Sequence, residues 1–256
     1  GFWKELSTLK LNKFKLSEEP VRVYGTFTEA AAPSAVASLL LDETSFATPG
    51  PAVGTLYNFN TMEGFTRANK RELFEAAAAR LQASVRAGDS AAFVPFILVT
   101  FANLKTHQFH YYMAIMATDL AGVTEELVAE NGQRSLAPFS LPSPEPSFFG
   151  LASDSPTTAD EVLTLSVADS PVLGMVDSTA RQDAFSWPLR TLLASARLAG
   201  RTGRLSVLVT RGARAGGPQL LTFAPVDADA VAQAKFKAYG WVRTNNKVKE
   251  RVVNAA

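Results

Sequence analysis

The sequence predicts an α+β fold with a mixed sheet, in which helices pack on the sheets. Three observations carry this prediction. Residues 69–87 have apolar side chains at helical spacing, whereas residues 95–104 and 107–117 are apolar runs joined by a link too short for anything but an antiparallel hairpin. Residues 171–210 read as a strand–helix–strand unit. With 256 residues, 47% of them hydrophobic, the chain is long enough for one large domain or two small ones.

The chain is predicted to open with a short helix, which Pro20 ends because proline cannot continue a helix. Residues 21–27 are rich in valine and aromatic side chains and are predicted to form a strand. Residues 29–52 are rich in alanine, serine, threonine and proline, which predicts a loop with one short apolar element at residues 36–41.

The strongest single helix prediction is residues 69–87. Asn69 is a suitable N-cap and Gly88 a suitable C-terminal stop. The apolar side chains that recur on one helical face are Phe74, Ala78, Leu81 and Val85. The next run, residues 95–104, is almost continuously apolar, which favours a central strand of a sheet.

The second half begins with a proline-rich stretch. Residues 136–158 contain five prolines and are predicted to form a loop or hinge. The elements that follow are a strand at 171–176, a helix at 188–199, strands at 204–210 and 219–226, and a last helix from Asp227 or Asp229 to about Ala238.

This organisation predicts one domain over residues 1–240. Two subdomains joined by a hinge near residues 136–158 are the alternative. Residues 241–256 are basic and polar and are predicted to form a linker.

Charge is unevenly distributed, although the net charge is only +1. Residues 119–185 contain 11 acidic and 2 basic side chains, and residues 186–256 contain 12 basic and 3 acidic ones. These acidic and basic blocks either face each other, face water or attract a partner of opposite charge.

The sequence contains little catalytic chemistry. It has no cysteine, no Gly-Lys-Ser/Thr phosphate loop and no dinucleotide-binding glycine pattern. His107 and His110 are three residues apart on a predicted strand, which places them on opposite faces and argues against a metal site or a catalytic triad. We therefore expect no catalytic residues, no cofactor and no metal.

Other classes are also disfavoured. No apolar run approaches the roughly 18 residues that a membrane span needs. The basic stretch at residues 235–251 contains Tyr239 and Trp241 but is more like a charged linker than a base-stacking platform, so no nucleic-acid binding is expected. The chain starts without methionine or a secretory signal and lacks cysteine, which is typical of a fragment of a cytoplasmic protein.

The stretch Ser186-Trp187-Pro188-Leu189-Arg190 raises a specific question. Pro188 suits the first turn of a helix, so half of the stretch is explained as a helix start. Trp187 is either a core side chain or an exposed binding anchor. Arg190 lies where the helix dipole disfavours a cation, which indicates a carboxylate partner, either internal or external.

Four blocks of sequence resemble one known family. They are PAVGTLYNFNTMEGF (51–65), FILVTFANLKTHQFHYY (96–112), SWPLR (186–190) and KAYGWVR…RVVN (237–254). In this order they resemble the N-terminal domain of autophagy-related protein seven, the activating enzyme for the ubiquitin-like modifiers of autophagy. The resemblance implies a mixed α and β domain that recruits the autophagy conjugating enzymes for thioester transfer.

The resemblance also implies that the ATP site and catalytic cysteine lie in a C-terminal domain outside this chain, and that the full-length protein is a cytoplasmic homodimer through that domain. The candidate partner-binding residues are Trp187 and Arg190, with Lys105, Phe109 and Tyr111 as weaker candidates. Two alternatives stay open: a stand-alone enzyme with an unrecognised small-molecule site, and a structural scaffold for the catalytic half.

Overall fold

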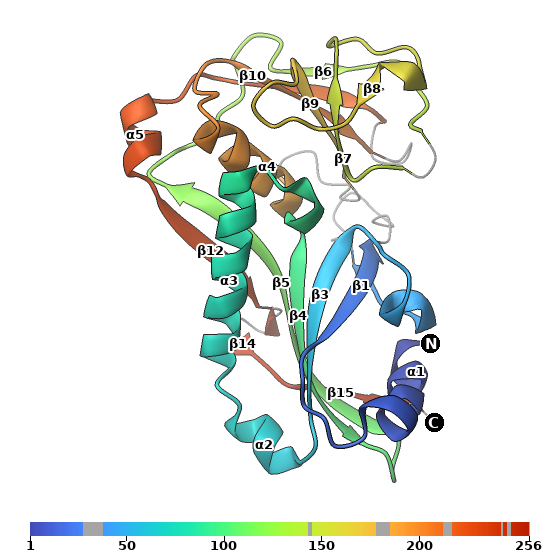
Figure 1. Ribbon diagram of the computed structural model, residues 1–256. Helices are drawn as coiled ribbons and strands as arrows, with labels where there is room; N and C mark the ends of the chain where they lie inside the picture. The colour runs from blue at the N-terminus through green and yellow to red at the C-terminus, as the bar shows by residue number, and fades with distance from the viewer. Residues whose placement is uncertain are drawn as a thin grey trace.

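The described residues of the computed structural model form two large sheets, one above the other in Figure 1, and a separate two-stranded pair, with helices between and beside the large sheets. The structure describes residues 1–27, 38–142, 145–177, 185–211, 217–241, 243–244 and 247–255. One cluster of buried apolar side chains extends from the first sheet, through the helix that follows residue 186, into the second sheet. The predicted α+β class, with a mixed sheet and helices packed on the sheets, is therefore confirmed.

The first sheet has the strand order β12-β5-β4-β3-β1-β2, and β15 also pairs with β5. The parallel pair is β3 with β4, and the hairpin of β4 and β5 is antiparallel, as predicted. The strands are β1 (Val21–Phe27), β2 (Leu39–Leu40), β3 (Ala52–Phe59), β4 (Pro95–Asn103), β5 (Gln108–Ala121), β12 (Lys235–Trp241) and β15 (Arg251–Asn254).

Helices cover both faces of the first sheet. Helices α2 (Met62–Arg67) and α3 (Lys70–Ala87) lie on the face of β5 that carries Tyr112, whose ring packs against Phe65. Helix α1 (Phe2–Leu9) lies on the opposite face, where Trp3 contacts the rings of Phe109 and Tyr111. The shorter helical turns are the π-helix η1 (Lys10–Phe14), η2 (Glu43–Phe46) and η3 (Ser90–Ala92).

The prediction for α3 is confirmed almost to the residue. The side chain of Asn69 accepts a hydrogen bond from the Glu72 N–H, and Gly88 has a left-handed conformation that ends the helix. The predicted apolar face is buried at Ala78, Leu81 and Val85.

The second sheet has the order β6-β11-β10-β9-β7-β8. Strands β9 and β10 are parallel and are joined through helix α4 (Trp187–Leu198), so the predicted strand–helix–strand unit is confirmed. The strands are β6 (Gln133–Ser135), β7 (Phe148–Leu151), β8 (Val162–Leu163), β9 (Val172–Val176), β10 (Leu205–Thr210) and β11 (Gln219–Phe223), and the remaining short elements are η4 (Ala159–Glu161), α5 (Ala228–Gln233) and the pair β13 (Arg243–Thr244) and β14 (Lys247–Val248).

Helix α4 packs at the junction of the two sheets. Leu189, Leu192 and Leu193 point into the common core, as their spacing predicted. The Ser195 hydroxyl donates a 2.7 Å hydrogen bond to the Val85 carbonyl at the end of α3. The Val85 carbonyl also accepts a long 3.4 Å hydrogen bond from the Gly88 N–H at the helix end, so the Ser195 hydroxyl gives it a closer partner and ties the two helices together.

Three local expectations differ from the structure. The proposed hinge at residues 136–158 includes the buried strand β7, because its apolar run Phe148–Leu151 pairs with β9 and packs in the sheet between flanking prolines. The last helix ends at Gln233 instead of about Ala238, since the chain then pairs with β5 as β12. The predicted linker at residues 241–256 includes β15, which fills the rest of the same edge of β5. The expected element at residues 36–41 lies partly outside the described residues.

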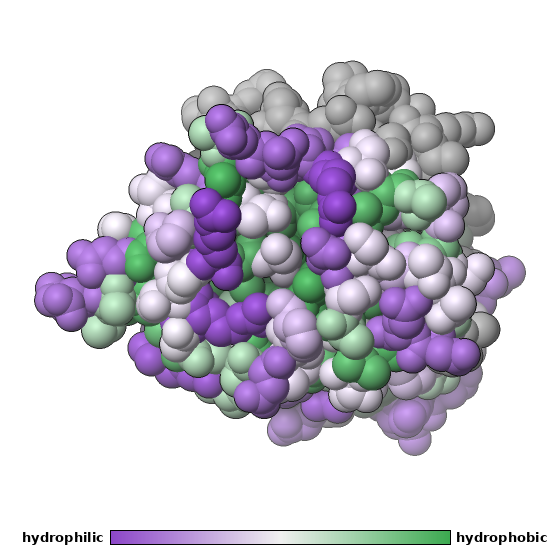
Figure 2. Space-filling view, turned by 90° about the horizontal axis from the view of Figure 1, so that it is seen from above, coloured by the Kyte–Doolittle hydropathy of each residue, from purple (hydrophilic) through white to green (hydrophobic). Residues whose placement is uncertain are grey.

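The outer face of the second sheet has a small core of its own. Phe149, Leu208 and Leu220 are buried there and are packed against Leu136 and Phe139. Figure 2 looks onto the molecule from this side and shows apolar side chains in small groups separated by hydrophilic ones. The proline-rich segment therefore folds back over the sheet and buries apolar area at this face.

Gly240 provides a test of the β12–β5 pairing. It is buried at the irregularity between Tyr239 and Trp241, and a Cβ added there would overlap the Ile115 carbonyl oxygen. We expect Gly240→Ala to lower the free energy of unfolding by about 1–3 kcal/mol, because the clash is with backbone that must shift. Urea unfolding measures this loss. Gly203→Ala is the matched control, since a Cβ there meets no atom within 4 Å, and equal stability of the two variants would contradict the described pairing.

Candidate functional site

The first turn of α4 presents Trp187 at the surface. The Ser186 hydroxyl caps the helix by accepting a hydrogen bond from the Leu189 N–H, and Pro188 occupies the first turn. Trp187 is 40% exposed and contacts the ring of Tyr239 edge-on, at 6.1 Å between ring centroids. Of the two alternatives left open by the sequence, the exposed position is the one observed.

Arg190 has an internal carboxylate partner. Its Nε donates a hydrogen bond to the Phe185 carbonyl at 3.3 Å, and its Nη1 lies 3.7 Å from Oδ2 of Asp119 on β5. The second distance suits an ion pair but is too long for a good hydrogen bond. The Arg190 side chain is 42% exposed, so part of the guanidinium is accessible from solvent.

Asp119 is held from the other side by Tyr239. The Tyr239 hydroxyl donates a 2.6 Å hydrogen bond to Oδ1 of Asp119. Burial, followed by the Asp119 carboxylate as hydrogen-bond acceptor and charge, raises the pKa of Tyr239 to about 12. Tyr239 therefore stays protonated, and remains a donor, throughout the physiological range.

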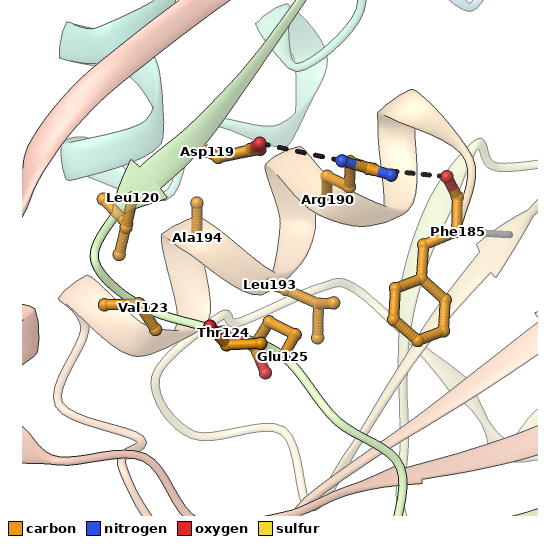
Figure 3. A pocket seen from close by; sticks show the side chains of 9 residues that line it. All are labelled: Asp119, Leu120, Val123, Thr124, Glu125, Phe185, Arg190, Leu193 and Ala194. Atoms are coloured by element: carbon orange, nitrogen blue, oxygen red, sulfur yellow. Dashed lines mark hydrogen bonds and ion pairs between the residues drawn. The ribbon is translucent and has the colours of Figure 1, made fainter.

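A hollow of about 260 Å³ lies beside Arg190. Figure 3 shows that its wall combines the Arg190 and Asp119 pair with apolar side chains from α4 and from the end of β5. The residues that line it are Asp119, Leu120, Val123, Thr124, Glu125, Phe185, Arg190, Leu193 and Ala194. Such a hollow is small for a drug-sized ligand but fits one or two side chains of a partner.

The acidic and basic blocks face each other in part. Besides Arg190 and Asp119, the structure pairs Arg197 with Glu125 at 2.9 Å, and Arg211 with Asp177 at 3.4 Å, both arginines being buried. Together these three pairs neutralise three of the 11 carboxylates of the acidic block internally.

Two lysines add exposed positive charge beside the α4 start. Lys237 lies directly opposite Asp119 in the β12–β5 register. Lys235 is two residues earlier in β12 and therefore on the same face, and both side chains are exposed. We call Trp187, Arg190, Lys235, Lys237 and Tyr239 the α4–β12 surface. It combines two aromatic rings with a net positive charge.

The weaker candidates lie at the other end of β5. Lys105 is exposed in the β4–β5 turn, and Tyr111 is half-buried against Trp3. Tyr111 and Asp119 are eight residues apart on one strand, so the two groups are separated by roughly 25 Å. Phe109 is fully buried under Trp3; its expected place on an exposed surface is corrected, because its side of β5 is covered by α1.

The two histidines have separate surroundings, and His110 contacts a single carboxylate. Nδ1 of His110 lies 2.6 Å from the Glu250 carboxylate, whereas His107 is exposed in the β4–β5 turn with a positive φ of 52°. Within the described ranges, no three His, Asp or Glu side chains come close enough together to hold a metal ion. In the same part of the chain, no helix has the length and apolar character of a membrane span.

Sequence reasoning missed four residues of this site: Asp119, Lys235, Lys237 and Tyr239. Asp119 is the first residue of the acidic block, and Lys237 and Tyr239 belong to the last of the four resembling blocks. These signals were present, but β12 was expected to be part of a helix and a linker, which hid its pairing with β5.

Fold and site together define an α+β domain that presents an aromatic, basic surface beside a small hollow. Comparison with known proteins identifies its family. The family described as the ubiquitin-like modifier-activating enzyme ATG7 N-terminus matches residues 1–256, and the chain belongs to this family.

Individual relatives agree with this assignment. Ubiquitin-like modifier-activating enzyme ATG7 of Rattus norvegicus is 26% identical over 280 residues, which cover 94% of this chain and 40% of the rat protein. The crystal structure of Kluyveromyces marxianus Atg7NTD has a TM-score of 0.73 at 18% identity, covering 100% of this chain and 94% of that one. The Atg7NTD–Atg10 complex of the same organism gives 0.70 at 16% identity, with 99% and 91% coverage. The matched stretches span only 18% to 40% of the curated relatives' length.

Proposed function

We propose that the chain is a non-catalytic docking domain of the autophagy activating enzyme. It recruits the autophagy conjugating enzymes, so that ubiquitin-like modifiers are transferred to them as thioesters. The catalytic cysteine, the ATP site and the contacts of a homodimer belong to parts of the protein outside this chain, and the protein acts in the cytoplasm. Family membership supports the assignment, as does the relative of the same fold that was crystallised with Atg10.

The observation that carries the proposal is the exposure of Trp187 and Arg190 on the same helical turn. Tryptophan and arginine are enriched among the residues that dominate binding energy. A docking segment that is flexible when free must recover its ordering free energy from a few such anchors. The positive charge of the α4–β12 surface favours an acidic segment and raises its rate of association.

Isothermal titration of the chain with Atg10 and with the other autophagy conjugating enzymes from the same source tests the proposal. We expect saturable one-to-one binding. Absence of binding to every one of these enzymes would contradict the docking role and favour a structural scaffold.

Arg190→Glu is expected to weaken conjugating-enzyme binding by roughly tenfold at low salt and by severalfold less at about 0.5 M salt. The variant replaces an exposed cation of the surface by an anion, and salt screens the resulting repulsion. Titrations at both salt concentrations measure the difference.

The matched control for Arg190→Glu is Arg134→Glu, which reverses a similarly exposed arginine on β6 of the second sheet. A salt-independent loss of affinity, or an equal loss in the control, would exclude a direct electrostatic contribution of Arg190. Circular dichroism of both variants confirms that the domain remains folded.

A further inference from the structure

We infer that Tyr239 is the positioning residue of the docking surface: it aligns Trp187 through its ring and Arg190 through Asp119. This inference rests on the proposed function, because it assigns a role within the same surface. Tyr239 is itself only half-buried and lies on β12, an element far from α4 in sequence. It therefore connects the two sequence-distant parts of the α4–β12 surface.

The first connection is between rings. The Tyr239 and Trp187 rings meet edge-on, with an angle of 79° between their planes. Aromatic pairs prefer this geometry because the positive edge of one ring faces the negative face of the other. Trp187 is 40% exposed, and the Tyr239 ring restrains its rotamer at the surface. A restrained anchor loses less entropy when it binds.

The second connection runs through the hydroxyl. By donating to Oδ1 of Asp119 at 2.6 Å, Tyr239 holds the carboxylate close to itself and leaves Oδ2 at 3.7 Å from Nη1 of Arg190. The guanidinium has five N–H donors. One donates to the Phe185 carbonyl, and the guanidinium also lies close enough to the Tyr239 hydroxyl to oppose, as a hydrogen-bond donor, the burial that raises the pKa of Tyr239. The loose contact with Asp119 orients the group and leaves the remaining donors for a partner.

Removal of the hydroxyl changes the balance between these groups. Without its donor on β12, Asp119 is free to turn toward Arg190 and form the close two-point pair that arginine and carboxylate favour. That pair consumes the N–H groups that a partner carboxylate needs. Tyr239 thus keeps the Arg190 guanidinium oriented and, at the same time, leaves N–H groups of it free to bind a partner carboxylate.

The test is Tyr239→Phe, which keeps the ring and removes only the hydroxyl. We expect its affinity for Atg10 to be about threefold to tenfold lower than that of the wild type. In the Asp119→Asn background the same change should have little further effect, since the competing carboxylate is gone. Tyr24→Phe on β1, at the far side of the first sheet, is the matched control and should bind like the wild type.

The free domain gives a readout that does not need the partner. In ¹⁵N NMR spectra, the Arg190 Nε–H signal should move in Tyr239→Phe and should return toward its wild-type position in Tyr239→Phe/Asp119→Asn. The Trp187 indole signal should move only in Tyr239→Leu, which removes the ring as well as the hydroxyl. If the Arg190 Nε–H signal does not move when Tyr239→Phe removes the hydroxyl, the inference is overturned, even if the melting temperature of that variant falls. If the wild type binds neither Atg10 nor any other autophagy conjugating enzyme, the proposed function fails, and the NMR result still decides the positioning role.

Discussion

Trp187→Ala is expected to weaken binding of the conjugating enzymes by about 2 kcal/mol or more, roughly thirtyfold in Kd, while the melting temperature stays close to that of the wild type. Trp187 is exposed on the first turn of α4, and its ring contact in the part of the chain that the structure describes is the T-shaped one with Tyr239. Its truncation therefore leaves no cavity in the core. Titration calorimetry and a thermal melt of the same sample give both numbers.

Trp3→Ala is the control for this variant, and it has the opposite expectation. Trp3 packs between Phe109 and Tyr111 at the hairpin end of β5, so its loss should lower the melting temperature and leave affinity unchanged. If Trp3→Ala weakens binding and Trp187→Ala does not, the docking surface lies at the Lys105 and Tyr111 end. A fall in melting temperature for Trp187→Ala would mean that this ring supports the fold.

Arg197→Leu is expected to lower the free energy of unfolding by about 3–5 kcal/mol. The Arg197 side chain is fully buried and pairs with both carboxylate oxygens of Glu125, at 3.0 and 2.9 Å. It also donates to the backbone carbonyls of Arg201, Gly203 and Ala224. Without the Arg197 guanidinium, the mostly buried Glu125 carboxylate and the three carbonyls lose a hydrogen-bond donor. Each of these groups then stays buried without that partner, which costs free energy of desolvation.

Urea unfolding of Arg197→Leu, compared with Arg190→Leu, measures this contribution. The Arg190 side chain is half-exposed and its ion pair with Asp119 is long. Arg190→Leu should therefore change the free energy of unfolding by less than about 1 kcal/mol. A further variant, Arg197→Leu/Glu125→Leu, should recover part of the loss, since it removes the unpaired carboxylate but not the unpaired carbonyls. If Arg197→Leu leaves the free energy of unfolding nearly unchanged, water molecules hydrogen-bond to Glu125 and to the three carbonyls in place of Arg197.

The sequence by itself determined the elements whose signals are local. Helix α3 was predictable because Asn69, an apolar stripe and Gly88 act within a few turns of one another. The β4–β5 hairpin was predictable because the link between the two apolar runs is too short for any other connection. The unit β9–α4–β10 was predictable from two short apolar runs on either side of a helix that starts with proline. The resembling blocks added the family, and with it the expectation of a docking role.

Only the tertiary structure decided which of these side chains are exposed and which charges pair. Trp187 and Phe109 are both aromatic candidates for partner binding in the sequence. In the structure Trp187 is exposed, whereas Phe109 lies buried under α1. Likewise Asp119 meets Arg190 and Tyr239 only because β12 and α4 converge on the end of β5. Helix and turn signals depend on neighbours within a few residues. Burial and ion pairing depend on contacts between segments that are far apart in the sequence, and local patterns do not specify these contacts.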